Sequence, residues 1–484
     1  MSDPIETFTF YDLETFGRDP KQDRIVQFAG VRTDANLNVI EQLVIYCKPQ
    51  RDYLPSIEAI TITGITPSFA DRNGLSENAF IEQVLQFLSR TNNCVLGFNS
   101  IKFDDEFIRH TAFRNFYPPY AYNSMCGSSR WDIYPLVRLC CALCPEGINW
   151  PYDEKEGRYV LKLAELTRAN GLEHAHAHDA LSDVLATIEV MKLIISRQPQ
   201  MFNFIFHHRT KKEILGYLVD TATGSLSDRA MVTIDSAFGP EHLFTGVVMP
   251  VLLDENRSSL YCWNLSQPAS DLKDNPTLDE LDCSAVAMSD LGIIKIKLGA
   301  CPILVPYTTL KKNNRHERVG IDMQTVADNI EYLRSVDLNK QYMVGCIDKF
   351  ARHYESQNSK KADPEFGLYG YLSKSQETRR ADQQLMNEIH RAEKTNPEIL
   401  KDIRFSESDM NELLFRYRAR NYENQLSRDE RAIWNQRISD YSREHSSDFM
   451  TELNDLCIQN EKNPQMLELL KETAMYYGIT GNEY

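Results

Sequence analysis

Two acidic residues near the start of the chain have a spacing that suits metal binding. Asp12 and Glu14 follow the apolar run Phe8 to Tyr11 and are separated by one residue. On a strand, residues i and i+2 point to the same face with Cα atoms about 6.5 Å apart, so both carboxylates can reach one cation. The alternative is a strand end that reaches solvent, and for an isolated pair this alternative is favoured.

A second acidic group, Asp104-Asp105-Glu106, follows an apolar segment that ends in Gly97 and Asn99. Acids at the start of a helix interact favourably with the helix dipole, so simple capping is an alternative to a chemical role. Asp105 could serve as the cap and Asp104 as the functional group, and the sequence leaves this choice open.

A third group pairs His178 with Asp183. Residues five apart on a regular helix point about 140° away from each other. We therefore expect His178 in the loop before a helix and Asp183 inside that helix. Zinc binding by the nearby His174 and His176 is the weaker interpretation, because no cysteine pair accompanies them.

The order of these groups is more informative than any one of them. Cleavage of a phosphodiester by two metal ions about 4 Å apart needs three or four carboxylates to hold the ions, and carboxylate oxygens are the ligands that Mg²⁺ prefers. A neutral histidine beside them can accept a proton from the attacking water. The sequence therefore indicates a metal-dependent phosphodiesterase.

The elements that must position these groups fall into three regions, which we place at residues 7–196, 199–350 and 355–480. In the first region, the residue patterns predict a meander of three antiparallel strands, a later buried strand and a helix with one apolar face. The corresponding segments are Phe8–Tyr11, Ile25–Arg32, Val39–Tyr46, Cys94–Phe98 and Leu181–Met191.

The second region has short strand-like runs separated by turn residues, which predicts a small β-rich domain, and an amphipathic helix from Met323 to Leu333 closes it. The third region is poor in Gly and Pro and rich in Glu, Lys, Arg, Leu and Gln, so we expect it to be mainly helical.

Composition excludes several classes of protein. The chain has 484 residues, a hydrophobic fraction of 42% and a net charge of −16. No apolar run approaches the roughly 20 residues that span a bilayer, the acidic N-terminus is unlike a signal peptide, and the irregularly spaced cysteines suit a reducing cytoplasm. The negative charge argues against a general nucleic-acid binder but allows one basic path beside an acidic metal site.

These residues together resemble the DEDD exonuclease superfamily, in the branch that has a histidine before the last Asp. Asp12, Glu14, Asp104 and Asp183 match its four acids, and His178 matches its general base. Almost the whole chain is similar to the narrower family of bacterial exonuclease I. The segments that carry this likeness are 12–17 (DLETFG), 62–66 (ITGIT), 103–106 (FDDE), 145–151 (PEGINWP), 177–180 (AHDA) and 417–421 (YRARN).

The resemblance implies a ribonuclease H-like exonuclease domain, an SH3-like domain and a C-terminal helical domain. It implies removal of nucleoside 5′-monophosphates from the 3′ end of single-stranded DNA, with two Mg²⁺ ions, for which Mn²⁺ can substitute, in DNA repair and recombination. It also implies a cytoplasmic monomer that does not associate with membranes. The implied protein partner is the C-terminal tail of single-stranded DNA-binding protein.

The resemblance also assigns DNA contacts. Besides Glu14, the positions that contact DNA in the family are Arg109, Tyr120, Arg138, Lys162 and Lys211. For the nearby Phe113 and Phe116, burial in a core is the better interpretation, and Cys140, Cys141 and Cys144 are expected to be ordinary buried thiols.

Two alternatives to this function stay open. A catalytically silent protein that binds single strands would lack one of the carboxylates, and none is missing here. An exonuclease that acts on RNA would share the acids, because discrimination between DNA and RNA depends on contacts to the 2′-hydroxyl.

Overall fold

Strand β1 (Thr7–Thr15) lies between two partners. It pairs antiparallel with β2 (Ile25–Asp34) and parallel with β4 (Asn93–Gly97), and β2 pairs with β3 (Val39–Tyr46), which gives the order β3-β2-β1-β4. The predicted meander and the predicted later strand are therefore confirmed. β1 and β2 are buried on both faces along most of their length.

The computed structural model describes residues 5–124, 127–172, 179–267, 275–335, 339–357 and 363–478. The chain folds into two compact units, each made of segments that are separated in the sequence. The first comprises Met1–Ser129, Ala175–Leu185 and Ala362–Tyr484, and the second comprises Arg130–His174 and Ala186–Lys361. The predicted limits of the three regions at 196–199 and 350–355 stay a prediction.

Helices of the first unit cover the sheet. Tyr11, Leu13 and Phe28 form one core with side chains of α3 and α4, among them Phe80 and Phe107. Local capping fixes where several of these helices begin: the hydroxyl of Ser56 accepts from the Ala59 amide at the start of α1. The helices are α1 (Ile57–Thr63), α2 (Pro67–Asn73), α3 (Glu77–Leu88), α4 (Asp104–Arg114) and α5 (Ala121–Ser124).

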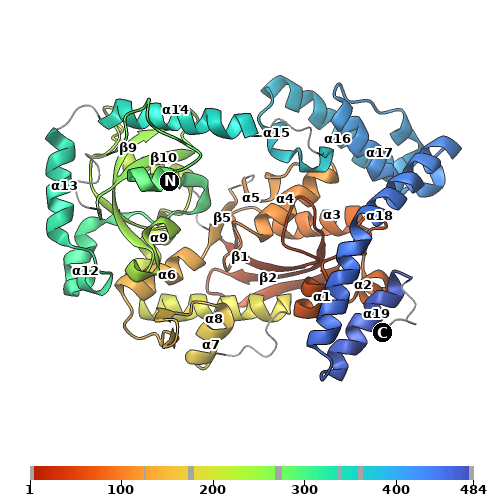
Figure 1. The fold of residues 1–484 in the computed structure, drawn as a ribbon, viewed down its shortest axis with the longest axis horizontal. Coiled ribbons are helices and arrows are strands. Elements are labelled where there is room, and N and C mark those ends of the chain that lie inside the picture. Colours follow the sequence, from red (N-terminus) through yellow and green to blue (C-terminus); the bar gives the residue numbers. More distant parts are fainter. Residues whose placement is uncertain are drawn as a thin grey trace. The chain divides into compact units, whose positions relative to one another are not determined.

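The C-terminal helices belong to this same unit, and the prediction that the region is mainly helical is confirmed. Phe113 and Phe116 pack into a core with Leu413 and Tyr417 of α17, so their predicted core role is confirmed. Helices α18 and α19 lie beside α1 and α2 (Figure 1). The helices are α15 (Leu368–Leu372), α16 (Gln376–Thr395), α17 (Ser408–Asn421), α18 (Arg428–Gln459) and α19 (Pro464–Tyr476).

The chain enters the second unit through β5 (Ser129–Asp132), and α8 (Ala180–Arg197) begins in the first unit and continues in the second. Before α8, the second unit contains a short hairpin and two helices. These elements are α6 (Tyr134–Leu143), β6 (Tyr152–Asp153), β7 (Arg158–Tyr159) and α7 (Leu163–Ala169).

The β-rich character predicted for the middle of the chain is confirmed by a five-stranded sheet with the order β11-β10-β9-β8-β12. Ile214 and Leu218 of α10 pack into its core. The strands are β8 (Met231–Ile234), β9 (Thr245–Leu253), β10 (Ser259–Asn264), β11 (Ile293–Lys297) and β12 (Val305–Pro306). The helices are α9 (Pro199–His207), α10 (Lys211–Leu218), α12 (Arg315–Arg318), α13 (Met323–Ser335) and α14 (Asn339–Gln357).

Across the described ranges, none of the helices has both the length and the apolar character that crossing a membrane requires.

Candidate active site

The end of β1 carries Asp12 and Glu14. In the pairing with β2, Asp12 lies opposite Ala29 and Glu14 opposite Gln27, so both acids point to the same face of the strand. The register shifts immediately after Glu14, and Glu14 is only 8% exposed. The pair is therefore held on an ordered strand rather than on a solvated strand end.

The first turn of α8 supplies Asp183. Asp179 fixes the start of this helix, because its side chain accepts from the Ser182 amide at 3.0 Å and its carbonyl accepts from the Asp183 amide at 3.0 Å. Carboxylate oxygens of Asp12, Glu14 and Asp183 all lie within 4.8 Å of one another. Two segments that are about 170 residues apart thus bring three acids to one place.

Electrostatics makes this cluster costly without a cation. Burial raises the pKa of Asp12 well above its ordinary range, and the charges of Asp104, Asp183 and Asp179 raise it further. Burial, followed by the charges of Asp12, Asp183 and Asp179, raises the pKa of Glu14 to about 9. Carboxylates in this state favour a hard divalent cation, so the residues fit a metal site.

Asp104 is the first residue of α4 and is buried. It is not part of the three-acid cluster, but its charge is the largest charge effect on the pKa of Asp12. A sharp turn precedes it: a Cβ on Gly97 would lie 2.7 Å from the Cβ of Ser100 and 3.0 Å from the carbonyl oxygen of Tyr11. Glycine is required there, and the close approach brings the chain after β4 next to β1.

The structure shows what Asp105 contacts. The cap position of α4 is Phe103, and no side chain caps it. Asp105 is fully buried, and its Oδ1 accepts from Tyr11 at 2.6 Å and from Tyr122 at 2.9 Å. The interpretation of Asp105 as a helix cap is therefore wrong, because its carboxylate bonds to two phenols in the core instead.

The residue predicted as the general base, His178, lies outside the described residues. Asp183 is within α8, as predicted, and that helix begins at Ala180. Asp179 was missed by sequence reasoning, although its charge acts on both Asp12 and Glu14. Its position directly before a helix was the available signal, because Asp favours such positions.

In the first unit, the predicted DNA contacts Arg109 and Tyr120 lie against each other. The guanidinium of Arg109 lies 4.5 Å from the centre of the Tyr120 ring. Arg109 is only 5% exposed, and it forms ion pairs with Asp105 at 3.4 Å and with Glu106 at 2.5 Å. Tyr120 is 36% exposed, so its ring offers the more accessible surface of the two.

In the second unit, Arg138 and Lys162 line one pocket of about 320 Å³. The Arg138 guanidinium lies 4.7 Å from the Tyr134 ring and 4.3 Å from the Phe244 ring. Sequence reasoning missed the aromatic side chains here, because Phe244 is about 100 residues away in the chain. Other residues that line the pocket are Cys141, Asp153, Arg158, Tyr159, Val160, Leu161, Pro240 and Leu243.

The predicted contact Lys211 is not among the residues of this pocket. It is the first residue of α10, where Thr210 and Glu213 form a capping box, and its Nζ donates to the carbonyl oxygen of Asn256 at 2.9 Å. The neighbouring Arg209 is buried, donates to the Phe206 carbonyl and lies over the Phe206 ring. Arg209 therefore has a packing role.

The predicted burial of the cysteines at the end of α6 is confirmed. Cys140, Cys141 and Cys144 are all buried and free of disulfides. Burial raises the pKa of Cys141 to about 12, which makes it unreactive at neutral pH.

Comparisons with known proteins cover almost the whole chain. An exonuclease family matches residues 9–191, the exonuclease I SH3-like domain matches 209–349, and the exonuclease I C-terminal domain matches 362–479. The exodeoxyribonuclease I of Escherichia coli is 37% identical over 480 residues, which cover 97% of each chain. The chain belongs to the exodeoxyribonuclease I family.

Other members of the exodeoxyribonuclease I family agree with this assignment. The Haemophilus influenzae enzyme is 36% identical over 482 residues, covering 97% of this chain and 98% of the relative. The crystal structure of the E. coli enzyme with a dA16 oligonucleotide matches with a TM-score of 0.85 at 34% identity, covering 98% of this chain and 99% of that one. A structure of SSB/exonuclease I with an inhibitor matches with a TM-score of 0.86 at 34% identity, covering 98% of this chain and 100% of that one.

The expected fold class is therefore confirmed: this exodeoxyribonuclease I family member has a ribonuclease H-like exonuclease domain, an SH3-like domain and a C-terminal domain. It is an exonuclease, and its exonuclease domain together with the acidic cluster indicates dependence on divalent metal.

Proposed function

We propose that this exonuclease removes nucleotides one at a time from the 3′ end of single-stranded DNA and releases nucleoside 5′-monophosphates. The observation that carries the proposal is the group of three carboxylates within 4.8 Å at the end of β1, with Asp104 beside Asp12, in a chain of this family. The reaction is hydrolysis of the terminal phosphodiester.

Four acids hold the metal in this proposal: Asp12, Glu14, Asp104 and Asp183. We assign two Mg²⁺ ions, for which Mn²⁺ can substitute, because several carboxylates at one place suit a two-ion site. Such ions, when bound, stabilise negative charge on the scissile phosphate and promote deprotonation of water. His178 accepts the proton of the attacking water, and Glu14 also contacts the terminal nucleotide.

The DNA contacts combine aromatic rings with positive charge, which suits single strands because bases stack on rings and phosphates bind cations. The E. coli relative has been crystallised with a dA16 oligonucleotide. In this chain, Tyr120 with Arg109, the pocket of Arg138 and Lys162, and Lys211 are the proposed contacts. Because Arg109 pairs with Asp105 and Glu106, we assign it mainly to shaping the surface and assign Arg138 to phosphate.

The family relationship supports a biological setting. We propose a role of the monomeric chain in DNA repair and recombination in the cytoplasm. A structure of SSB/exonuclease I supports single-stranded DNA-binding protein as a partner, and we propose that its C-terminal tail makes the contact.

Digestion of oligonucleotides that carry a label at either end tests the function. We expect a label at the 3′ end to be released at once as a mononucleotide, and a strand labelled at the 5′ end to shorten stepwise. Both reactions should require divalent metal. Blunt duplex and RNA of the same sequence serve as controls and should be cut slowly. Release from the 5′ end, equal attack on duplex, or binding without cleavage would overturn the proposal, and the last result would identify a silent binding protein.

A further inference from the structure

A hydrogen bond joins the chain neighbours of two proposed metal ligands. Tyr11 precedes Asp12 on β1, and Asp105 follows Asp104 on α4. The hydroxyl of Tyr11 donates to Oδ1 of Asp105 at 2.6 Å. Tyr11 is 2% exposed and Asp105 is 0% exposed. The short distance is typical of a hydroxyl that donates to a carboxylate.

This bond lies on the face of β1 opposite the acidic cluster. Side chains alternate along a strand, so Tyr11 points away from Asp12 and Glu14. It belongs to the core with Phe28 and Phe107, and helices α3, α4 and α5 are drawn beside β1 (Figure 1). Tyr11 and Asp105 therefore touch neither the cluster nor a bound strand directly.

The carboxylate oxygens of Asp105 accept hydrogen bonds from several side chains. Its Oδ1 accepts from Tyr11 and from Tyr122 at 2.9 Å, and its Oδ2 lies 3.4 Å from the guanidinium of Arg109. A buried carboxylate with three donors is held rigidly, because removing any donor would leave part of its charge uncompensated. The residue is thus a fixed point at the start of α4.

Asp12 lies on β1 and Asp104 is the first residue of α4, so the two acids come from separate backbone segments. Two acids that must bind a shared metal centre therefore need the backbone to hold them together, since their own charges favour separation. The Tyr11–Asp105 bond connects β1 and α4 at the residues next to these two acids.

We propose that Tyr11 and Asp105 are a positioning pair, which sets the spacing of Asp12 and Asp104 and thereby the affinity of the site for divalent metal. This inference rests on the metal site of the proposed function. Groups that orient metal ligands from outside the coordination shell commonly change metal affinity by about 10- to 100-fold when they are removed.

The protein supplies a matched control. Tyr122 donates to the same Oδ1 of Asp105 and is equally buried, but it comes from α5, and its chain neighbours Ala121 and Asn123 are not proposed ligands. Tyr11→Phe and Tyr122→Phe each remove one hydroxyl from the same carboxylate and keep the ring in the core. A purely structural role predicts the same effect of both.

The experiment measures binding of Mn²⁺ to the full-length, DNA-free protein by electron paramagnetic resonance. We expect Tyr11→Phe to raise the Kd by about 10-fold, with a matching rise in the Mg²⁺ concentration for half-maximal hydrolysis and little change of kcat at saturating Mg²⁺. In chelator, Tyr122→Phe should lower Tm by about the same amount as Tyr11→Phe does. It should leave the Kd for Mn²⁺ near that of wild type. Equal Kd values for the two variants would overturn the proposal.

A double-mutant cycle gives a second, independent reading. In an Asp105→Ala background, adding Tyr11→Phe should not change the Kd for Mn²⁺ further, because the bond is already absent. Additive effects of the two substitutions on the Kd for Mn²⁺ would overturn the proposal. A wild-type Kd in Asp105→Ala alone would also overturn it. If Tyr11→Phe does not fold, the Kd of Asp105→Ala decides the question. A wild-type protein that hydrolyses DNA in excess chelator would instead refute the proposed function.

Discussion

Asp12, Glu14 and Asp183 hold their carboxylates close together and largely away from water, so each negative charge raises the free energy of the others. This explains why burial and mutual repulsion raise the pKa of Glu14 to about 9. A divalent cation removes the repulsion and keeps the acids ionised. At the scale of single residues, the site is thus organised for metal binding at the expense of stability in the metal-free protein.

The first prediction follows from this repulsion. In excess chelator, Asp183→Asn should have a higher Tm than wild type, because the amide removes one negative charge from the cluster. The rise of Tm that Mg²⁺ causes by binding the folded state should be lost, together with hydrolysis. Calorimetry with and without Mg²⁺ checks this. Asp71→Asn, which changes an exposed acid, is the control, and an unchanged Mg²⁺ effect in Asp183→Asn would contradict the assignment.

The second prediction concerns the general base. His178→Ala should lower turnover by about 10²- to 10⁴-fold, the usual contribution of a general base. Binding of a single-stranded oligonucleotide and of Mn²⁺ should change much less, because the imidazole is assigned to proton transfer alone. Single-turnover kinetics at neutral pH measures the first effect and fluorescence anisotropy the second. Turnover at the wild-type level would show that another group takes the proton.

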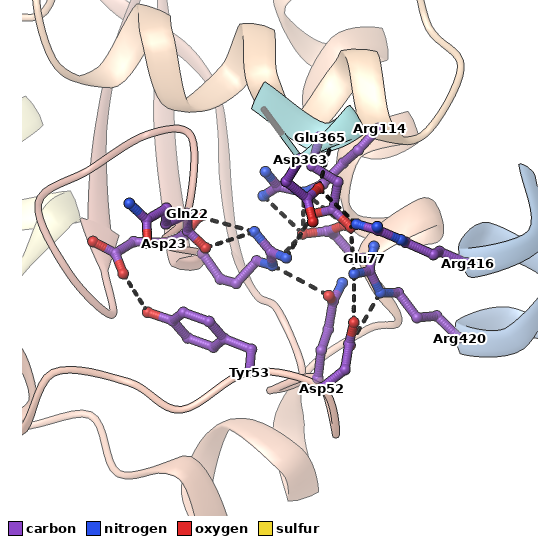
Figure 2. Close-up of polar contacts among 12 residues, drawn as sticks. Gln22, Asp23, Asp52, Tyr53, Glu77, Arg114, Asp363, Glu365, Arg416 and Arg420 are labelled. Carbon is purple, nitrogen blue, oxygen red and sulfur yellow. Dashed lines mark hydrogen bonds and ion pairs between the residues drawn. The ribbon is translucent and has the colours of Figure 1, made fainter. Parts of the chain in front are cut away.

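At the scale of elements, buried ion pairs within the first unit join the C-terminal helical region to the N-terminal segment that carries β1 to β4 (Figure 2). Glu77 at the start of α3 lies 2.9 Å from Arg114, and Arg24 lies 2.8 Å from Glu365 of the turn Pro364–Phe366. Arg420 of α17 also pairs with Glu365. These pairs are nearly inaccessible to water, so removing one partner leaves a buried charge without compensation.

The third prediction tests this network through pH. Burial alone would raise the pKa of Glu77, but the charges of Arg114 and Arg24 outweigh it and lower the pKa from 4.5 to about 2. Because the folded-state pKa is depressed, the charge stabilises the fold above pH 4.5, and this contribution is lost as the pH falls towards 2.

Glu77→Gln should therefore lower the free energy of unfolding at pH 7 by about 3–5 kcal/mol, and the difference from wild type should shrink as the pH falls below 4.5. Urea unfolding across this range measures it. Glu82→Gln on the same helix removes an exposed pair with Lys394, which should cost no more than about 1 kcal/mol. Equal effects of the two substitutions would contradict the role of burial.

At the scale of the whole molecule, a chain with a net charge of −16 must bind a polyanion through local positive groups. The second unit supplies Arg138, Arg158 and Lys162 around one pocket and Lys211 at the start of α10, whereas the acidic cluster belongs to the first unit. In the proposed function, these groups of the second unit bind the strand beyond the terminal nucleotide.

The fourth prediction is a dependence on strand length. Lys211→Glu should weaken binding of strands of a dozen or more nucleotides and flatten the salt dependence of their binding, because fewer counterions are released. Dinucleotides, which reach only the metal site, should be unaffected. Lys212→Glu makes the same charge change at the next, exposed position and is the control. Equal effects on long and very short substrates would refute a role of Lys211 along the strand.

The sequence by itself determined the local structure and the inventory of chemical groups. The meander of β1 to β3, the helix α8 with Asp183 inside it and the helical C-terminal region were all predictable, because periodicity and turn residues act over short distances. The four acids and the likeness to exonuclease I were equally visible, since they depend only on residue types and their order.

Tertiary structure decided which partners a buried polar side chain contacts. Asp104 and Asp105 are adjacent in sequence, and the packing of α4 against β1 directs Asp105 to Tyr11 and Tyr122 in the core. Periodicity cannot show such a choice, because the partner atoms come from segments that are 94 and 17 residues away. The same reason hid the pairing of Arg24 with Glu365, which are 341 residues apart: burial and ion pairing are properties of the folded chain, fixed by contacts between distant segments.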